Sequence, residues 1–179
     1  MNTVQPIRSK RKIDAMKKAL PPMHRLMFVI GINSALRVSD LLALKVGDVR
    51  DKDFITVTEQ KTGKKKRFKI NAAIKREVKN YLATGNFSDD EYLFRSPRGN
   101  KPISRVAAWK ALNKAAAEVG LEEIGTHTLR KTFGYWAHKS GVDIATLQRV
   151  FNHSHPNITQ RYLGITQDDI DDVYDRVQL

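Results

Sequence analysis

Apolar residues recur at helical spacing along much of the chain, and two prolines divide the first such stretches. Ser9 is suited to cap a helix that runs to about Leu20, and Pro21 and Pro22 then end it and open a second helix. This second stretch, MHRLMFVIGINSAL, is apolar nearly all round, which predicts a central and buried helix. The following VSDLLAL predicts a short amphipathic helix that starts at Ser39.

Between residues 53 and 70 the pattern changes from helical periodicity to alternation. DFITVTEQ and KKRFKI are short and rich in Ile, Val, Thr and Phe, and KTGK lies between them, which predicts a β-hairpin. A short extended piece is expected at YLFRS. Further helices are expected over about 71–83, 103–119, 127–140, 143–151, 157–163 and 167–177. The predicted fold class is therefore mainly α with a small antiparallel β-sheet, an α+β fold.

Of the composition of the chain, only the net charge indicates a class of binding partner. The chain has 179 residues, of which 41% are hydrophobic, so it can bury a genuine core. Its formal net charge is +13, from 32 Lys and Arg against 19 Asp and Glu. Such an excess favours a polyanionic partner, most often nucleic acid, and the alternative is a basic surface that serves solubility.

Several function classes are excluded or disfavoured by what the sequence lacks. The chain has no cysteine, so it has no disulfide, no thiolate ligand for zinc and no Cys nucleophile. Its first residues are too polar for a signal peptide, and its longest apolar run, LMFVIGI, is too short to span a membrane. We therefore expect a cytoplasmic protein with no membrane partner.

The stretch GTHTLRKTFGYW combines an apolar stripe with two polar side chains. His127 and Arg130 lie about one turn apart on one face of the predicted helix, away from the apolar stripe that runs from Leu129 to Trp136. Gly134 follows on the polar side. We interpret this as a His and an Arg presented together above a surface without bulk, which suits an anionic group. The alternative is two ordinary surface residues.

Three other positions have side chains suited to chemistry on phosphates. Arg37 falls at the junction of two helices, where a guanidinium clamps carbonyls or binds two phosphate oxygens at once. Lys61 begins the turn KTGK and is either solvated or a proton donor in a nucleic-acid groove. Tyr162 lies nine residues after His153, across an expected turn at Pro156, and its hydroxyl is a candidate nucleophile.

In this order, these motifs resemble the tyrosine recombinase family, also known as the phage integrase family. The resemblance rests on ALRVSDLLAL, a lysine at a hairpin tip, HTLR, and a His with a Tyr nine positions later, over about residues 8–177. It implies the catalytic-domain fold of that family and six catalytic residues: Arg37, Lys61, His127, Arg130, His153 and Tyr162. Nearby cations are expected to bind DNA: Lys64, Lys65, Lys66, Arg67 and Lys131.

The sequence departs from the family pattern at two positions. Asn152 stands where members often have Gly, in FNH in place of Leu-Gly-His, and Lys131 stands where a His often follows the second arginine. Neither change removes an expected catalytic group. The family's separate N-terminal core-binding domain has no counterpart here, so we expect a single catalytic domain over residues 1–179.

The resemblance implies a site-specific DNA recombinase or integrase of the kind found on mobile elements. Tyr162 would attack a phosphodiester to form a 3′-phosphotyrosine link and a free 5′ hydroxyl. Lys61 would protonate the leaving oxygen, and His127 would help to take the tyrosine proton or orient the phosphate. A 5′ hydroxyl of a partner strand would then attack the covalent link.

In that mechanism Arg37 and Arg130 would hold the non-bridging oxygens, and His153 would donate a further hydrogen bond. No metal and no cofactor is expected. The expected partner is double-stranded DNA, on which a protein that is monomeric in solution would form a tetramer. The segment after the tyrosine carries five aspartates over residues 168–175 and a narrow apolar stripe. It would dock on a neighbouring protomer or pack on its own domain.

Three other functions fit part of the pattern. A DNA-binding regulator of the same fold would bind but cleave nothing, and an enzyme related to type IB topoisomerases would cut and reseal one duplex. A metal-dependent nuclease would use His138, His153 and His155, but their spacing is not that of a zinc-binding helix and no acidic partner is in place.

Overall fold

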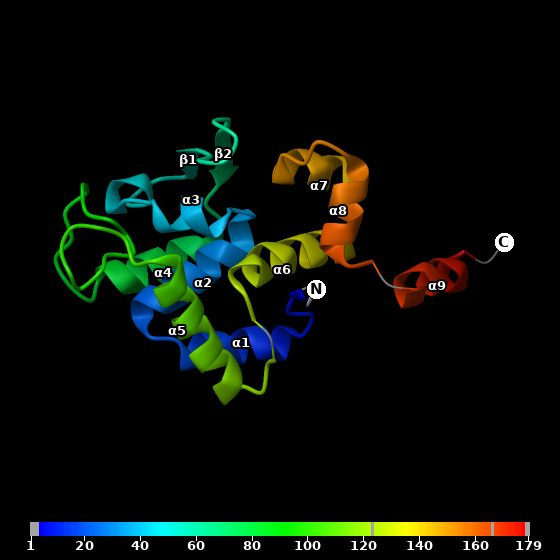
Figure 1. Ribbon diagram of the computed structural model, residues 1–179, viewed down its shortest axis with the longest axis horizontal. Helices are drawn as coiled ribbons and strands as arrows, with labels where there is room; N and C mark the ends of the chain where they lie inside the picture. The colour runs from blue at the N-terminus through cyan, green and yellow to red at the C-terminus, as the bar shows by residue number, and fades with distance from the viewer. Residues whose placement is uncertain (1–3, 123, 166, 178–179) are drawn as a thin grey trace.

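The buried helix predicted from the apolar sequence lies at the centre of the fold (Figure 1). The computed structural model describes residues 4–122, 124–165 and 167–177. The central helix is α2 (Pro22–Ser34), and residues 26–31 on it are fully buried. The helices that pack against it are α1 (Lys10–Ala19), α3 (Val38–Leu42), α4 (Ala72–Leu82), α5 (Arg105–Glu118) and α6 (Thr126–Lys139).

The predicted helix boundaries hold to within about two residues. The Ser9 hydroxyl accepts a hydrogen bond from the backbone N–H of Lys12 and so caps α1, and Pro22 occupies the first turn of α2. The short helix α3 begins one residue earlier than predicted because Arg37, rather than Val38, has the extended backbone of an N-cap. In the described part of the chain, no helix combines the length and the apolar character that crossing a bilayer requires.

The predicted hairpin is confirmed as strands β1 (Phe54–Thr58) and β2 (Lys65–Lys69), which pair antiparallel. Alternation places one face of this hairpin inward. Ile55 is fully buried on that face, and Lys66 lies on it opposite Val57. In the stretch YLFRS, Tyr92 and Arg95 each form one isolated β-bridge, with Lys45 and Pro102 respectively, and the stretch does not form a regular strand. Mainly helical structure with a small antiparallel sheet is therefore the observed fold class.

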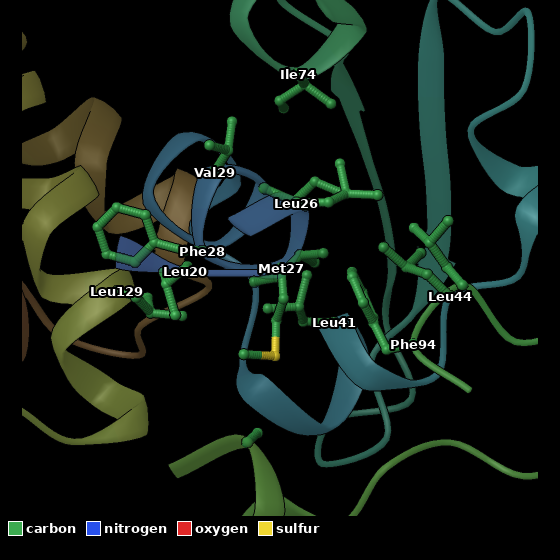
Figure 2. Close-up of a cluster of buried hydrophobic side chains, with 14 of the residues drawn as sticks. Leu20, Leu26, Met27, Phe28, Val29, Leu41, Leu44, Ile74, Phe94 and Leu129 are labelled. Carbon is green, nitrogen blue, oxygen red and sulfur yellow. The ribbon is translucent and has the colours of Figure 1, made fainter. Parts of the chain in front are cut away.

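The main core surrounds α2 and joins it to α4, α6 and the segments around the hairpin (Figure 2). Phe28 of α2 lies beside Leu129 of α6 in this view, and Leu26 faces Ile74 of α4. Gly31 allows α6 to approach closely, because a Cβ on it would lie 2.6 Å from Leu129 Cδ1. The main core thus sets the position of α6, which carries two of the residues expected to be catalytic, His127 and Arg130.

Helices α7 (Ile144–Phe151) and α8 (Pro156–Leu163) lie near one end of α6 (Figure 1), and a smaller, second cluster of buried side chains joins them to it. We name this cluster the α7–α8 cluster. Its fully buried members are Ala35, Leu147, Phe151 and Leu163. Phe133 of α6 packs against this cluster, whereas Trp136 packs against the main core. The single apolar stripe predicted for this helix is therefore divided between two cores.

The prediction that Gly134 leaves an open surface beside the polar side chains is wrong. Gly134 is buried, and a Cβ on it would lie 2.8 Å from Phe151 Cζ and 2.9 Å from Leu163 Cδ2. The missing side chain makes room for α7 and α8, not for an anion. Helix α6 has two buried faces, so a pattern of one apolar and one polar face could not describe it.

The last helix, α9 (Gln167–Arg176), extends away from the body of the molecule beyond α8 (Figure 1). Its apolar residues are exposed: Ile170 by 44%, Val173 by 55% and Tyr174 by 76%, and Val177 after it by 60%. The predicted apolar stripe on an acidic helix is therefore present and largely open to solvent.

Candidate active site

All six side chains expected to be catalytic line one cleft of about 640 Å³. They come from segments that are distant in sequence. These segments are the N-cap of α3, the hairpin turn, the first half of α6, the residues directly after α7, and α8. The residues are Arg37, Lys61, His127, Arg130, His153 and Tyr162. The fold thus brings together the complete set that the motif order predicted.

Arg130 lines the cleft but is itself only 3% exposed, so the expectation of a surface-presented arginine is wrong. Its two terminal nitrogens each donate a 2.6 Å hydrogen bond to a carbonyl, one to Ala35 at the end of α2 and one to Phe151 at the end of α7. A guanidinium has five N–H donors, so others remain for an anion. Arg130 is therefore held between the end of α2 and the end of α7.

Arg37 is held by a buried carboxylate. Its Nη1 lies 2.8 Å from Oε2 of Glu59, which is fully buried, while the Arg37 side chain is 19% exposed. Burial alone would raise the pKa of Glu59, but polar contacts from Thr62, Arg37 and Asn152 outweigh it and lower the pKa to about 2. Glu59 is therefore ionised at neutral pH. The motif analysis missed it, although a lone acidic residue beside a basic hairpin was a usable signal.

The hairpin lysines separate into exposed and buried groups. Lys61 lines the cleft from the turn, and Lys64, Lys65 and Arg67 are exposed. Lys66 is only 9% exposed, and its Nζ donates a 3.3 Å hydrogen bond to the Ala35 carbonyl. Burial, followed by the charge of Arg130, lowers its pKa to about 8.

Two of the five cations expected to bind DNA therefore differ from that expectation. Lys66 faces inward because strand alternation gives it the inner position opposite Val57. Lys131 is 8% exposed, and its ammonium lies 5.4 Å from the centre of the Tyr162 ring. Burial lowers the pKa of Lys131. Both side chains belong to the interior of the site and not to an open DNA surface.

His153 is neutral at neutral pH. Its ring stacks on Phe151 at 5.1 Å between centroids, and its Nδ1 lies 3.0 Å from the Thr159 hydroxyl. Burial and the charges of Arg130 and Arg37 lower its pKa to about 4. When the Thr159 hydroxyl donates to Nδ1, the proton of the neutral ring is on Nε2, which is then a hydrogen-bond donor.

His127 lies near the start of α6 and lines the same cleft. Partial burial, followed by the charges of Arg130 and Lys131, lowers its pKa. The neutral imidazole that results is able to accept a proton at neutral pH. A charged histidinium would have no free site for a proton, whereas neutral His127 is suited to the role of a base.

Tyr162 has an environment that keeps its hydroxyl protonated in the free protein. The ring lies 5.3 Å from the rings of both Phe151 and His153, measured between centroids. Its hydroxyl is buried and has no hydrogen-bond partner among the described residues. Burial raises the pKa of Tyr162, although the charges of Arg130 and Arg37 oppose this shift. A base or a bound phosphate must therefore assist any attack by this oxygen.

Asn152 has a structural reason to stand where the family often has Gly. It ends α7 in the left-handed conformation, with φ 53°, which Gly adopts freely and Asn tolerates better than most residues. Unlike Gly, Asn152 also has a side chain, and its Nδ2 donates a 3.1 Å hydrogen bond to Oε2 of Glu59. The departure therefore preserves the turn and adds a contact.

The three histidines considered for a metal site do not gather into one. His138 Nδ1 lies 3.4 Å from the Val142 carbonyl, at the other end of α6 from His127, whereas His153 lies in the cleft. Within residues 4–122, 124–165 and 167–177, no group of three or more His, Asp or Glu side chains is placed to hold a metal ion.

Sequence comparison identifies proteins similar to this chain. A model of the Phage integrase family matches residues 7–168. The protein named "Probable integrase/recombinase YoeC" from Bacillus subtilis is 52% identical over 171 residues, which cover 94% of this chain and 93% of that protein. Tyrosine recombinase XerA of Pyrococcus furiosus is 32% identical over 158 residues, which cover 87% of this chain but 54% of XerA. The chain thus spans nearly all of one relative and about half of the other.

Solved structures share the fold at low sequence identity. The crystal structure of XerA recombinase matches with a TM-score of 0.81 and 19% identity, covering 98% of this chain and 65% of that chain. The post-cleavage complex of XerH with its palindromic difH substrate matches with a TM-score of 0.75 and 17% identity, covering 97% and 53%. The arrangement of helices and hairpin described above is therefore that of tyrosine recombinase catalytic domains.

Proposed function

Since the chain belongs to the phage integrase family and is a site-specific recombinase of the tyrosine type, we propose that its cleft cuts and rejoins DNA through a covalent bond to Tyr162. The convergence of six side chains of the required types in one cleft carries this proposal. Family, relatives and fold favour recombination over a non-catalytic regulator or a topoisomerase-like enzyme.

The first part of the mechanism is phosphate binding by the two arginines. Arg37 and Arg130 are both held by contacts behind the cleft, so their remaining N–H groups are oriented before DNA arrives. Negative charge grows on the non-bridging oxygens as the phosphorus becomes five-coordinate, and preorganised donors stabilise it most there. His153 adds a neutral donor through its Nε2.

The second part is the exchange of one ester for another. The Tyr162 oxygen forms a bond to phosphorus, and the bond from phosphorus to the 5′ oxygen breaks. His127 takes the tyrosine proton, and Lys61 donates a proton to the 5′ oxygen. A 5′ hydroxyl of another strand reverses these steps and releases Tyr162. The number of phosphoesters is unchanged, so the exchange needs no nucleotide hydrolysis.

A nicked duplex tests covalent cleavage directly, because loss of the short fragment after the nick prevents religation. We expect the parent protein to form an adduct that survives SDS. Tyr162→Phe should form none while its DNA affinity stays within about twofold of the parent, since affinity depends mostly on phosphate charge. Tyr174→Phe, a change at an exposed tyrosine of α9, is the matched control and should retain the adduct. An adduct in Tyr162→Phe would refute the assignment.

The proposed ligand is double-stranded DNA. XerH is solved with its difH substrate, and the Tn1549 transposon integrase is solved with transposon end DNA. In this chain, exposed Lys64, Lys65 and Arg67 lie on the hairpin beside the cleft. Each phosphate neutralised by such a cation contributes about −0.9 to the slope of log affinity against log salt. Affinity that does not change between low and physiological salt would contradict this role.

We also propose that α9 links protomers, so that a monomer in solution becomes a tetramer on DNA. The helix is acidic, and its apolar residues Ile170, Val173 and Tyr174 are exposed. An acidic helix of this kind complements a chain whose net charge is +13. Deleting residues 167–179 should impair strand exchange between two sites more than cleavage of one. Equal recombination by the truncated protein would refute the linking role.

The expectations of a single catalytic domain and of a cytoplasmic location stay predictions. The described residues supply the whole proposed catalytic set.

A further inference from the structure

One buried carboxylate joins three segments of the site. Glu59 is fully buried at the end of strand β1, directly before the hairpin turn. Its Oε2 lies 2.8 Å from Arg37 Nη1, accepts a 2.7 Å hydrogen bond from the Thr62 hydroxyl, and accepts a 3.1 Å hydrogen bond from Asn152 Nδ2. Its other oxygen, Oε1, has no hydrogen-bond partner within the part of the chain that the structure describes.

Each of these three partners is, or directly adjoins, a residue of the proposed catalytic set. Arg37 is a member itself. Thr62 follows Lys61, and Asn152 precedes His153. The three segments otherwise belong to different parts of the fold, namely the start of α3, the hairpin turn and the end of α7. A single carboxylate oxygen is thus the common contact of all three.

We propose that Glu59 is a positioning residue for DNA cleavage, whose carboxylate holds Arg37 at the phosphate site and fixes the Lys61 turn and the His153 segment relative to it. This inference rests on the proposed function. Residues of one active site that act together need alignment to within about 1 Å, and misplacement of that size costs roughly 10²-fold in rate.

Glu59 acts through other residues and not on DNA. Among the described side chains that line the cleft, Thr62 and Asn152 are included and Glu59 is not. Its pKa of about 2 keeps it ionised through the neutral range, so it neither donates nor accepts a proton during the reaction. Its negative charge also offsets the positive charges of Arg37 and of the buried Lys66, which would otherwise repel each other.

The asymmetry of the two carboxylate oxygens allows charge and geometry to be tested separately. In Glu59→Gln the amide oxygen can occupy the position of Oε2 and accept the same contacts, while the amide nitrogen takes the position of Oε1. This variant keeps the shape and loses the charge. We expect cleavage about tenfold slower, because charge-assisted contacts are roughly twice as strong as neutral ones. Glu59→Ala loses every contact and should cleave about 10²-fold slower or worse.

A matched control is available in the main core. Glu77 pairs with Arg25 at 2.9 Å between α4 and α2, and its side chain is 12% exposed. Neither residue lines the cleft as the described residues form it. Glu77→Ala should lower the melting temperature but leave single-turnover cleavage within about twofold of the parent, as distant sites act independently. DNA affinity of all these variants should also stay within about twofold of the parent.

Modified substrates distinguish positioning from a loosened fold. A methylphosphonate at the scissile position removes the charge that Arg37 stabilises, and a 5′-bridging sulfur leaves without the proton that Lys61 supplies. If Glu59 positions these groups, the deficit of Glu59→Ala relative to the parent should shrink at least tenfold on the methylphosphonate, as should that of Arg37→Ala. On the substrate with the bridging sulfur, the rate deficit of Glu59→Ala relative to the parent should also shrink, and so should the rate deficit of Lys61→Ala. A general loss of structure would leave the same deficit on every substrate.

The outcomes separate this inference from the proposed function. If the parent forms no adduct with any substrate, the proposed function fails. If the parent cleaves and Glu59→Ala cleaves equally well, the positioning role is refuted. It is also refuted if the deficit of Glu59→Ala is the same on all three substrates. Should Glu59→Ala not fold, Glu59→Gln decides, since a parental rate in that variant would overturn the role of the charge.

Discussion

The two arginines proposed to hold the phosphate and the tyrosine proposed to attack it stand on different parts of the molecule. Arg37 follows the central helix α2, and Arg130 lies on α6, which packs against the main core through Leu129. Tyr162 lies on α8, over the much smaller α7–α8 cluster. Arg130 connects the two parts by its hydrogen bonds to the carbonyls of Ala35 and Phe151.

This difference leads us to expect that the two arginines are held more firmly than Tyr162. Many buried side chains surround α2, whereas four fully buried residues support α7 and α8. Regions with fewer buried apolar side chains open at lower free energies. We therefore expect the nucleophile segment to be shifted by DNA or by a neighbouring protomer at small cost, while the two arginines keep their positions.

The largest expected effect is loss of the residue that joins the two parts. Arg130→Ala should slow cleavage by roughly 10²–10³, as removal of one preorganised donor does in other enzymes. It should also lower the melting temperature, because the carbonyls of Ala35 and Phe151 lose their donor. Arg37→Ala should slow cleavage by a similar factor with less loss of stability, since its side chain is partly exposed. Single-turnover cleavage and thermal melting measure both effects, and cleavage at the parental rate would make either arginine structural only.

Truncation of one aromatic side chain in each core should separate the two parts. Phe28→Ala and Phe151→Ala each remove a fully buried ring, at about 3–5 kcal/mol. We expect Phe28→Ala to speed hydrogen exchange in all helices. Phe151→Ala should speed it mainly in α7 and α8 and leave α2 protected. Uniform exchange in both variants would mean that the molecule opens as one unit.

A milder comparison uses the two glycines at close helix contacts. Gly31→Ala would press on Leu129 in the main core, and Gly134→Ala would press on Phe151 and Leu163. Each should cost about 1–3 kcal/mol, as overpacking does. Gly134→Ala should reduce cleavage more for a given loss of stability, because it displaces the helix that carries Tyr162. If both variants lose cleavage in proportion to their loss of stability, the α7–α8 cluster affects cleavage only through the stability of the fold.

The smallest expected effect is a dependence of stability on acid. The folded pKa of His153 is about 4, below the ordinary value of 6.5, so the unfolded chain binds the proton first as the pH falls. The free energy of unfolding should therefore fall between pH 6.5 and pH 4, by about 1 kcal/mol from this group after allowance for solvent screening. Urea unfolding of His153→Gln should show a flatter profile over that range. Identical profiles would mean that His153 is not buried in its neutral form.

Local signals predicted most of the fold, because caps and prolines act on nearby residues. Ser9 and Pro22 set the first two helices, and the KTGK turn set the hairpin. The order of the motifs likewise predicted six of the side chains that line the cleft.

The burial of individual polar and small residues was the part that the sequence did not reveal. Lys66 was counted within a basic run, although strand alternation turns it inward. Gly134 was assigned to a polar face, because the pattern of α6 does not show that a second core covers it. Lys131 was expected to bind DNA, but it is only 8% exposed. Glu59 was overlooked although an acidic residue beside a basic hairpin is visible in the sequence, because its contacts with three distant segments appear only once they are folded together.

Mapping the DNA-linked residue tests the central claim most directly. Trypsin should release residues 162–176 as one peptide, which contains both Tyr162 and Tyr174. The adduct trapped on a nicked duplex is digested with nuclease and trypsin, and tandem mass spectrometry then locates the nucleotide remnant. We predict a 3′-phosphoryl link on Tyr162, in the cleft formed by the two parts. A remnant on Tyr174, on Tyr135 or on any serine would contradict it.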